Sequence, residues 1–302
     1  MSSAVLEKIK DYTINSISKL LDLPVKSYAS SSGNQERKHF TNFTELLTHL
    51  FREGIIVEIG PGIYTPPTIS ILQNLNGRGD YVALDGAIDR NDCYEKFFQV
   101  GGISEYTKEV LERDKQLYSY THPMVSIAHF LPFRKNSIDA IFYFKSFTKL
   151  LDVIIYNRED VNLYIGEWYR NKGIDKLVEK LGEKEKMKLS FLAYSTIVLE
   201  EARRVLKRGG KIIVVPEGRI LEDDLERELK TYARVTGNDF YVFEVEDPRW
   251  VVKDGDRIIS VSHWQDRTNP TRKVYVVTKK REKPLNEKGF IELAKVFGIN
   301  LE

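Results

Sequence analysis

The sequence is poor in cysteine and contains no long apolar run. A single cysteine, Cys93, occurs among its 302 residues, so no disulfide can form within the chain. This composition fits a reducing compartment. No apolar run approaches the ~20 residues of a membrane-spanning helix. Near the start, charged residues such as Glu7, Lys8 and Lys10 interrupt any signal-peptide core. We therefore expect a cytoplasmic protein without a membrane segment.

Positive and negative side chains nearly balance. The chain has 46 Lys and Arg against 44 Asp and Glu, a net charge of +2. Domains that bind nucleic-acid duplexes usually have a stronger basic bias, so there is no clear nucleic-acid signal. The densest basic run, Lys279–Arg281, is predicted to be the solvated end of a strand. The five histidines show no metal-ligand spacing, and we predict no metal site. They are His39, His49, His122, His129 and His263.

Short β-branched runs alternate with helical periodicities from about 55 to 215, which is typical of a parallel sheet with helices on both faces. We predict seven strands, at Gly54–Gly60, Tyr81–Asp85, Met124–Ile127, Ile138–Phe144, Lys211–Val215, Phe240–Val245 and Lys273–Thr278. No long helix separates the last two strands, which predicts an antiparallel edge strand and a small hairpin near Lys253–Asp256. The expected fold class is α/β, with a doubly wound, mostly parallel sheet.

The rest of the pattern predicts helices and two domains. An N-terminal helical cap, 1–53, is expected to contain helices at 5–21 and 43–53 with a polar loop, 27–38, between them. The main domain, 54–302, is expected to carry an irregular inserted segment, 148–188, and an extension, 247–271, between the last strands. Within the main domain we predict one helix that starts at Pro66. Four further helices are predicted over 103–115, 190–208, 221–235 and 286–297.

The first chemical signal is a glycine turn after the first strand, Val57-Glu58-Ile59-Gly60-Pro61-Gly62. Glycine lets the backbone approach a ligand closely, and the helix that follows offers free N–H groups. Dinucleotide enzymes share such turns, so the glycines alone are weak evidence. Glu58 is more informative, because a carboxylate there would repel a pyrophosphate and attract a positively charged amino acid group.

The second signal is Asp85, at the end of the next strand. A carboxylate can accept hydrogen bonds from both hydroxyls of a ribose. Asp85 therefore indicates a nucleoside without identifying it. A helix N-cap or turn residue is the alternative interpretation.

Two phrases further along the chain carry a family resemblance. Leu131–Ile141 reads LPFRKNSIDAI, and Leu199–Val214 reads LEEARRVLKRGGKIIV. Together with the glycine turn and Asp85, they resemble the class I S-adenosylmethionine-dependent methyltransferases over about residues 54–216. The second phrase can also be explained by a structural role alone. Its apolar side chains form one buried helix face, its basic side chains complement the helix dipole, and glycines permit the turn into the next strand.

The resemblance implies a Rossmann-like methyltransferase fold and S-adenosylmethionine as the cofactor. It implies that Glu58 and the glycine turn hold the methionine portion, Asp85 the ribose, and Ala128–Phe130 the adenine, and that Phe144 and Lys145 face the sulfonium. The residues it assigns to the cofactor are Glu58, Ile59, Gly60, Pro61, Gly62, Tyr64, Asp85, Gly86, Ala128, His129, Phe130 and Phe144.

Two departures leave alternatives open. Tyr64 stands where the family often has a third glycine, and Ile127 where many members have an acidic residue that binds the adenine amino group. His129 is the nearest polar side chain. A methyltransferase-like domain that serves as a catalytically inactive scaffold is therefore the alternative to an enzyme. A nicotinamide-dependent dehydrogenase is disfavoured by Glu58 and by the two phrases.

The acceptor and the catalytic residues are not identified by the sequence. Loops at the carboxyl ends of the strands should determine specificity. We expect 148–188, 247–271 and the N-terminal helices to enclose a small molecule, with Lys145, His263 and Trp264 as candidate substrate residues. Oligomer contacts or simple decoration are the alternative for these segments. Phe144–Phe147 lacks the Asn/Asp-Pro-Pro-aromatic pattern of enzymes that methylate nucleic-acid amino groups.

Overall fold

The computed structural model describes residues 38–60, 66–85, 121–144, 146–147, 159–216, 222–254, 257–262 and 272–301. These residues belong to two compact units. The sheet unit lies within Glu36–Lys149 and Thr196–Leu285, and the helical unit within Leu150–Ser195 and Asn286–Glu302. The helices predicted at 5–21 and 103–115 fall outside the described residues, and so does most of the polar loop.

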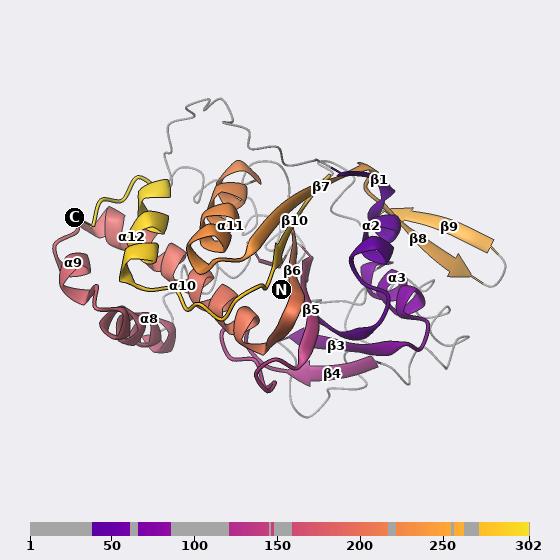
Figure 1. Ribbon diagram of the computed structural model, residues 1–302, viewed down its shortest axis with the longest axis horizontal. Helices are drawn as coiled ribbons and strands as arrows, with labels where there is room; N and C mark the ends of the chain where they lie inside the picture. The colour runs from indigo at the N-terminus through magenta and orange to yellow at the C-terminus, as the bar shows by residue number, and fades with distance from the viewer. Residues whose placement is uncertain are drawn as a thin grey trace, which may run out of the picture. The chain divides into compact units, whose positions relative to one another are not determined.

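An eight-stranded sheet forms the centre of the sheet unit (Figure 1). Its spatial order is β1-β7-β10-β6-β5-β2-β3-β4. β10 runs antiparallel to β6 and β7, and the other neighbouring pairs are parallel. The predicted fold class, a doubly wound and mostly parallel Rossmann-like sheet, is confirmed. The strands are β1 (Lys38–Asn42), β2 (Gly54–Ile59), β3 (Gly79–Asp85), β4 (Thr121–Val125), β5 (Ile138–Phe144), β6 (Leu206–Val215), β7 (Asp239–Asp247) and β10 (Lys273–Thr278).

Two details of the predicted sheet are wrong. The sheet has eight strands instead of seven, because β1 pairs with β7 in a segment expected to contain no strand. Phe40 of this short strand packs against the core, while His39 and Thr41 on either side are exposed. The antiparallel strand is not at the edge, because β10 lies between β6 and β7.

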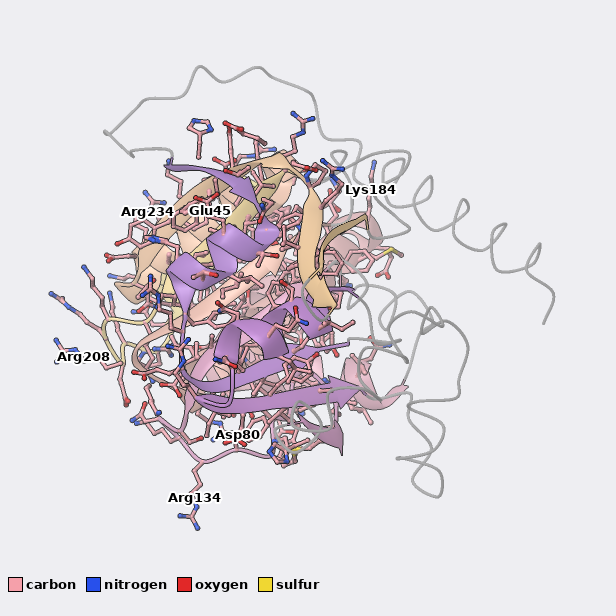
Figure 2. All side chains as sticks on the ribbon, turned by 90° about the vertical axis from the view of Figure 1, so that its right-hand side faces the viewer. Glu45, Asp80, Arg134, Lys184, Arg208 and Arg234 are labelled. Carbon is pink, nitrogen blue, oxygen red and sulfur yellow. The ribbon has the colours of Figure 1, made fainter. Side chains whose placement is uncertain are left out.

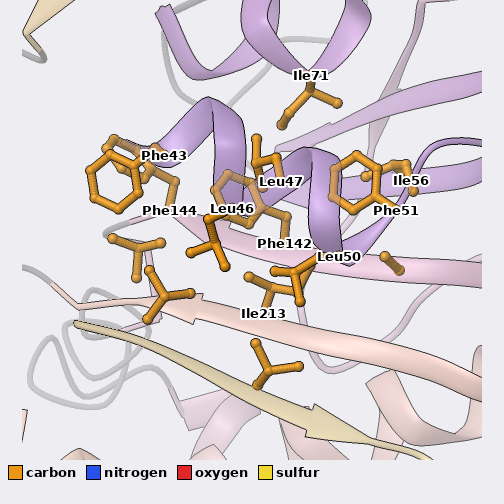
Figure 3. Close-up of a cluster of buried hydrophobic side chains, with 14 of the residues drawn as sticks. Phe43, Leu46, Leu47, Leu50, Phe51, Ile56, Ile71, Phe142, Phe144 and Ile213 are labelled. Carbon is orange, nitrogen blue, oxygen red and sulfur yellow. The ribbon is translucent and has the colours of Figure 1, made fainter. Parts of the chain in front are cut away.

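Two helices cover one face of the sheet, α2 (Phe43–Leu50) and α3 (Pro66–Leu75). Asn42 caps α2 by accepting a 2.9 Å hydrogen bond from the N–H of Glu45. The apolar face of α2 packs onto strand side chains such as Phe142 and Ile213 (Figure 3). α2 ends at Leu50, three residues before the predicted end. The start predicted for α3 at Pro66 is confirmed.

The other face of the sheet is also covered. Successive residues of β5 and β6 are buried, as expected for strands with helices on both sides. α11 (Glu222–Thr236) packs against β7 and β10, on the side of the sheet away from α2 and α3 (Figure 1). α10 (Glu183–Val205) enters the sheet unit at Thr196, and its last turns are buried.

The extension after β7 contains the predicted hairpin, formed by β8 (Arg249–Asp254) and β9 (Arg257–Ser262). Asp254 pairs with Arg257, which confirms the turn expected near Lys253–Asp256. The hairpin packs on α2 and α3, where the N–H of Val251 donates a 2.8 Å hydrogen bond to the Thr44 hydroxyl oxygen. Trp250 is fully buried, with its ring stacked 4.8 Å from that of Phe43.

The helical unit contains α8 (Glu159–Lys172), α9 (Asp175–Glu179), the first half of α10 and α12 (Glu287–Val296). Phe290 of α12 packs edge-on against Trp168 of α8, at 4.9 Å between ring centroids. The segment 148–188 was expected to be irregular, but its described part is largely helical. The division into a cap, 1–53, and a main domain, 54–302, remains a prediction, as does the role of the insertion. Within the described ranges, no helix is long and apolar enough to cross a bilayer.

Candidate functional site

The strand order reverses between β2 and β5. From β2 the chain proceeds to β3 and β4 on one side, whereas β5 and β6 lie on the other. Ligands of open α/β sheets bind beyond the carboxyl ends of the strands at such a switch point. Glu58, Gly60, Asp85 and Phe144 all lie at these carboxyl ends. The sheet therefore brings together four of the residues that the sequence assigned to the cofactor.

Gly60 begins the turn after β2, and its geometry favours glycine. Its φ is +65°, in the left-handed region that side chains disfavour. An added Cβ would lie 3.0 Å from the Cβ of Ser146. The N–H of Gly60 donates a 2.7 Å hydrogen bond to the carbonyl of Leu84, which joins the turn to the end of β3. Pro61, Gly62 and Tyr64, which continue the predicted turn, lie outside the described residues.

Ser146 joins the ends of β2 and β5. Its side chain is buried, and its hydroxyl donates a hydrogen bond to the carbonyl of Ile59. The sequence drew attention to Phe144–Phe147 only for the motif that it lacks, and Ser146 was missed. A correct prediction of the strand order could have identified Ser146. The residues after β5 lie close to the end of β2 only because these two strands are neighbours in the sheet. Ser146 therefore ties the end of β2, where the glycine turn begins, to the segment after β5.

Glu58 is buried at the carboxyl end of β2, with 1% of its surface exposed. The hydroxyl of Tyr81, on the neighbouring strand β3, donates a hydrogen bond to the Glu58 carboxylate. Tyr81 is fully buried and was not identified from the sequence. Because strand residues alternate between faces, Glu58 points to the same face as Ile56, which is the face covered by α2 and α3.

Asp85 is the last residue of β3 and pairs with Val125 of β4. It directly follows Leu84, whose carbonyl accepts the hydrogen bond from Gly60. The backbone thus holds Asp85 beside the glycine turn, as the predicted nucleoside site requires. Its side chain and the following Gly86 lie beyond what the structure describes.

A tight turn, 127–130, follows β4 at the same end of the sheet. The N–H of Phe130 donates a 3.0 Å hydrogen bond to the carbonyl of Ile127, and the Ser126 hydroxyl donates to the carbonyl of Phe130. Ala128 is buried and His129 half-buried, whereas Ile127 and Phe130 are 44% and 67% exposed. Within the segment expected beside the adenine, Phe130 is therefore the exposed apolar side chain, and Ile127 directly precedes this segment.

The two sequence phrases meet at the opposite, amino ends of β5 and β6. Arg204 forms an ion pair with Glu201 and donates hydrogen bonds of 3.0 Å to the carbonyls of Leu131 and Phe133. The Glu201 carboxylate accepts a 2.8 Å bond from the N–H of Leu131. Side chains of the second phrase thus bind the backbone of the first. This supports the interpretation of the second phrase as a structural element without a catalytic role. The four residues predicted to form the buried helix face are all buried, namely Leu199, Ala202, Val205 and Leu206.

Asp139 fastens the start of β2 to the same end of the sheet. Its carboxylate accepts a 2.8 Å hydrogen bond from the N–H of Ile55 and two bonds of 2.9 Å from Lys207. The helix was predicted to continue to 208, but α10 ends at Val205 and Lys207 already belongs to β6. Lys207 and Arg208 therefore do not complement the helix dipole from within the last turn. Arg208 instead points into solvent (Figure 2).

Lys279 is buried, contrary to the prediction for its segment. The run Lys279–Arg281 was expected to be solvated, but Lys279 is only 3% exposed. Its ammonium donates 2.7 Å hydrogen bonds to the side chain of Asn136 and to the carbonyl of Leu206. Burial lowers the pKa of Lys279, and nearby Glu282 opposes this effect. Lys280, in contrast, is exposed and forms an ion pair with Asp239 at 2.7 Å.

Of the remaining candidate residues, the structure describes Phe144. Phe144 is buried and packs edge-on against Trp250, at 5.4 Å between ring centroids. The substrate candidates Lys145, His263 and Trp264 lie outside the described residues. Across the described ranges, no three His, Cys, Asp or Glu side chains gather as metal ligands would.

No family model and no curated protein matches the chain. Similar solved structures include a SAM dependent methyltransferase from Aquifex aeolicus, 15% identical over 77% of this chain and 85% of that chain, with a TM-score of 0.35. Another is precorrin 8w decarboxylase from Methanobacterium thermoautotrophicum, 16% identical over 78% and 86%, with a TM-score of 0.36. A third is the aminoglycoside resistance methyltransferase NpmB1, 13% identical over 78% and 91%, with a TM-score of 0.38.

The architecture follows from the arrangement of the strands and does not depend on these similarities. The strand order, the reversal between β2 and β5 and the interior antiparallel β10 define the architecture. The sheet unit has a doubly wound, Rossmann-like fold, and β1 adds a strand to the seven that were predicted.

Proposed function

We propose that the chain is an S-adenosylmethionine-dependent methyltransferase. The observation that carries the proposal is the convergence of a buried carboxylate, Glu58, a left-handed glycine, Gly60, and Asp85 at the switch point of the sheet. A ligand with a cationic amino acid group and a ribose matches these groups, because carboxylates accept hydrogen bonds from both. A pyrophosphate matches them poorly, because Glu58 would repel it.

Each residue has a distinct role in this proposal. Glu58 binds the ammonium of the methionine portion, the backbone after Gly60 approaches its carboxylate, and Asp85 holds the ribose hydroxyls. The turn 127–130 borders the adenine with apolar contacts, and Phe144 borders the sulfonium. The bound cofactor supplies an electrophilic methyl group on sulfur.

The protein's contribution to methyl transfer is mainly positioning. An in-line displacement is accelerated when the acceptor atom is held against the methyl carbon. A general base is required only if the acceptor must lose a proton, and we assign none. We favour a small-molecule acceptor, with Lys145, His263 and Trp264 as candidate substrate residues. The β8–β9 hairpin belongs to the extension expected to enclose the acceptor, and its Trp250 packs against Phe144.

A scaffold that does not bind the cofactor is the second candidate. Ile127 favours it, because a 44% exposed apolar side chain stands where an acidic residue could bind the adenine amino group. The intact Glu58, Gly60 and Asp85 oppose it.

Calorimetric titration of the full chain distinguishes these candidates. We expect S-adenosylmethionine and S-adenosylhomocysteine to bind with micromolar affinity, NAD to bind much more weakly, and Asp85→Ala to lose the adenosyl ligands. Asp80→Ala is the matched control, because it removes a carboxylate from the other end of β3, where Asp80 pairs with His122 at 2.8 Å. Absence of adenosyl binding to the unmodified protein would favour the scaffold, and preferential binding of NAD would favour a dehydrogenase.

A further inference from the structure

A fully buried polar contact at the proposed site joins Glu58 to Tyr81. Tyr81 pairs with Ile56 in the parallel register of β2 and β3, whereas Glu58 pairs with Ala83. The tyrosine hydroxyl thus reaches two residues along the neighbouring strand to meet the carboxylate, as diagonal neighbours on one sheet face can. Their exposed fractions are 1% for Glu58 and 0% for Tyr81.

This contact bears on the charge and direction of the carboxylate. Burial among apolar side chains disfavours an ionised carboxylate, whereas a hydrogen bond donated to it favours the ionised form. A tyrosine hydroxyl has a single proton to donate. Because Tyr81 is part of the packed core with Ile56 and Phe142, its hydroxyl is held in place and fixes the orientation of Glu58.

We infer that Tyr81 is a positioning residue for the ammonium group of the cofactor and acts through Glu58. The inference rests on the proposed function and adds to it a residue that does not itself contact the ligand. Tyr81 holds the Glu58 carboxylate in a fixed orientation near the end of β2, two residues before Gly60. The cofactor's amino acid portion then meets a carboxylate that is already oriented.

Two probes separate this role from a general structural one. S-adenosylhomocysteine carries the amino acid portion, whereas 5′-methylthioadenosine has the same nucleoside and thioether without it. In calorimetric titrations of the full chain, we expect Tyr81→Phe to weaken S-adenosylhomocysteine about tenfold, the loss typical of one hydrogen bond to a charged group. Binding of 5′-methylthioadenosine should change by less than about twofold. Tyr275→Phe, the same change at a fully buried tyrosine of β10, should affect neither ligand.

A double-mutant cycle tests whether Tyr81 acts through Glu58. Glu58→Gln should weaken S-adenosylhomocysteine but not 5′-methylthioadenosine, and adding Tyr81→Phe should then cause no further loss. Glu58→Asp serves if Tyr81→Phe does not fold. It keeps the charge but withdraws the carboxylate from the tyrosine hydroxyl, so it should also reduce the affinity for S-adenosylhomocysteine selectively.

Each other outcome overturns a definite statement. Equal losses for both probes in Tyr81→Phe, or no loss for either, would contradict the positioning role. Additive losses in the double mutant would show that Tyr81 does not act through Glu58. If the unmodified chain binds neither probe, the proposed function itself fails, and this result differs from all the others because no variant is involved.

Discussion

The two ends of the central sheet use polar residues in opposite ways. At the amino ends of β2, β5 and β6, charged side chains bind the protein's own backbone, as Asp139 does with Ile55 and Arg204 with Leu131. At the carboxyl ends, a buried carboxylate, Glu58, and a left-handed glycine, Gly60, adjoin the place where a ligand of this fold would bind.

The difference separates the residues that carry the resemblance from those that could bind the proposed cofactor. The two phrases LPFRKNSIDAI and LEEARRVLKRGGKIIV are the longest part of the resemblance, yet they meet each other at the amino ends. The groups assigned to the cofactor are few and lie on separate strands. Changes at the amino ends should therefore reduce stability alone, whereas changes at the carboxyl ends should also reduce ligand binding.

Asp139→Ala should produce the largest loss of stability. It deprives the Ile55 N–H of its acceptor and Lys207 of its ion-pair partner, and we expect the free energy of unfolding to fall by about 2–3 kcal/mol. Asp139→Asn should lose less than about 1 kcal/mol, because its amide oxygen can still accept from Ile55 and the ion pair is half exposed. Urea denaturation measures both. The affinity of Asp139→Ala for S-adenosylhomocysteine should be unchanged. A loss of affinity would contradict the purely structural role of the amino ends.

Gly60→Ala and Gly209→Ala form the next comparison. Both glycines have positive φ, +65° and +82°, so each alanine should cost about 1–2 kcal/mol. Only Gly60 adjoins another side chain, since its added Cβ would meet Ser146 at 3.0 Å, while nothing lies within 4 Å of the corresponding position at Gly209. Calorimetry should therefore detect weaker S-adenosylhomocysteine binding in Gly60→Ala alone. Equal binding by the two variants would contradict a role for this turn in the site.

Ser146→Ala should have a smaller effect on stability. It removes the hydrogen bond to the carbonyl of Ile59 and should cost about 1 kcal/mol. Because that bond holds the end of β2 beside Gly60, we also expect a few-fold loss of S-adenosylhomocysteine affinity in titration calorimetry. Ser137→Ala is the control, since its hydroxyl donates to the carbonyl of Arg134 at the other end of the sheet. An identical affinity loss in both variants would argue against local action of Ser146.

The smallest expected effect is a pH dependence at the amino ends. Hydrogen bonds from Lys135 and Asn136 lower the pKa of the exposed Glu282 from 4.5 to about 2. A lowered folded-state pKa means that the stabilisation is present above about pH 4.5 and is lost as the pH falls toward 2. In urea titrations, the advantage of the unmodified protein over Glu282→Gln should shrink across this window. A constant difference would show that the Glu282 charge does not stabilise the fold.

Local chemistry made much of the fold predictable. β5 and β10 have the predicted bounds, and Pro66 begins α3, because apolar runs and proline mark these boundaries within a few residues. β1 was missed since Lys38–Asn42 is mostly polar and Phe40 alone supplies an apolar contact. The start of α10 was placed too late because its first turns, from Glu183 to Lys188, are mainly charged.

The missed site residues depend on contacts between distant segments. Tyr81 meets Glu58 only in the register of β2 with β3, and Ser146 meets Ile59 only because β5 is the other neighbour of β2. Lys279 is buried by partners 73 and 143 residues away in the sequence. No pattern within a short window could reveal such pairs, whereas Glu58 and Asp85 were found because each ends a recognisable strand.

Hydrogen–deuterium exchange of the full chain, with and without S-adenosylhomocysteine, tests the contrast between the two ends most directly. We predict that the ligand slows exchange in peptides that contain the carboxyl ends of β2 and β3, around Gly60 and Asp85. Exchange around Ser137 and Gly209, at the amino ends, should remain unchanged. Protection confined to the amino ends, or no protection at a ligand concentration in the millimolar range, would contradict the proposed site.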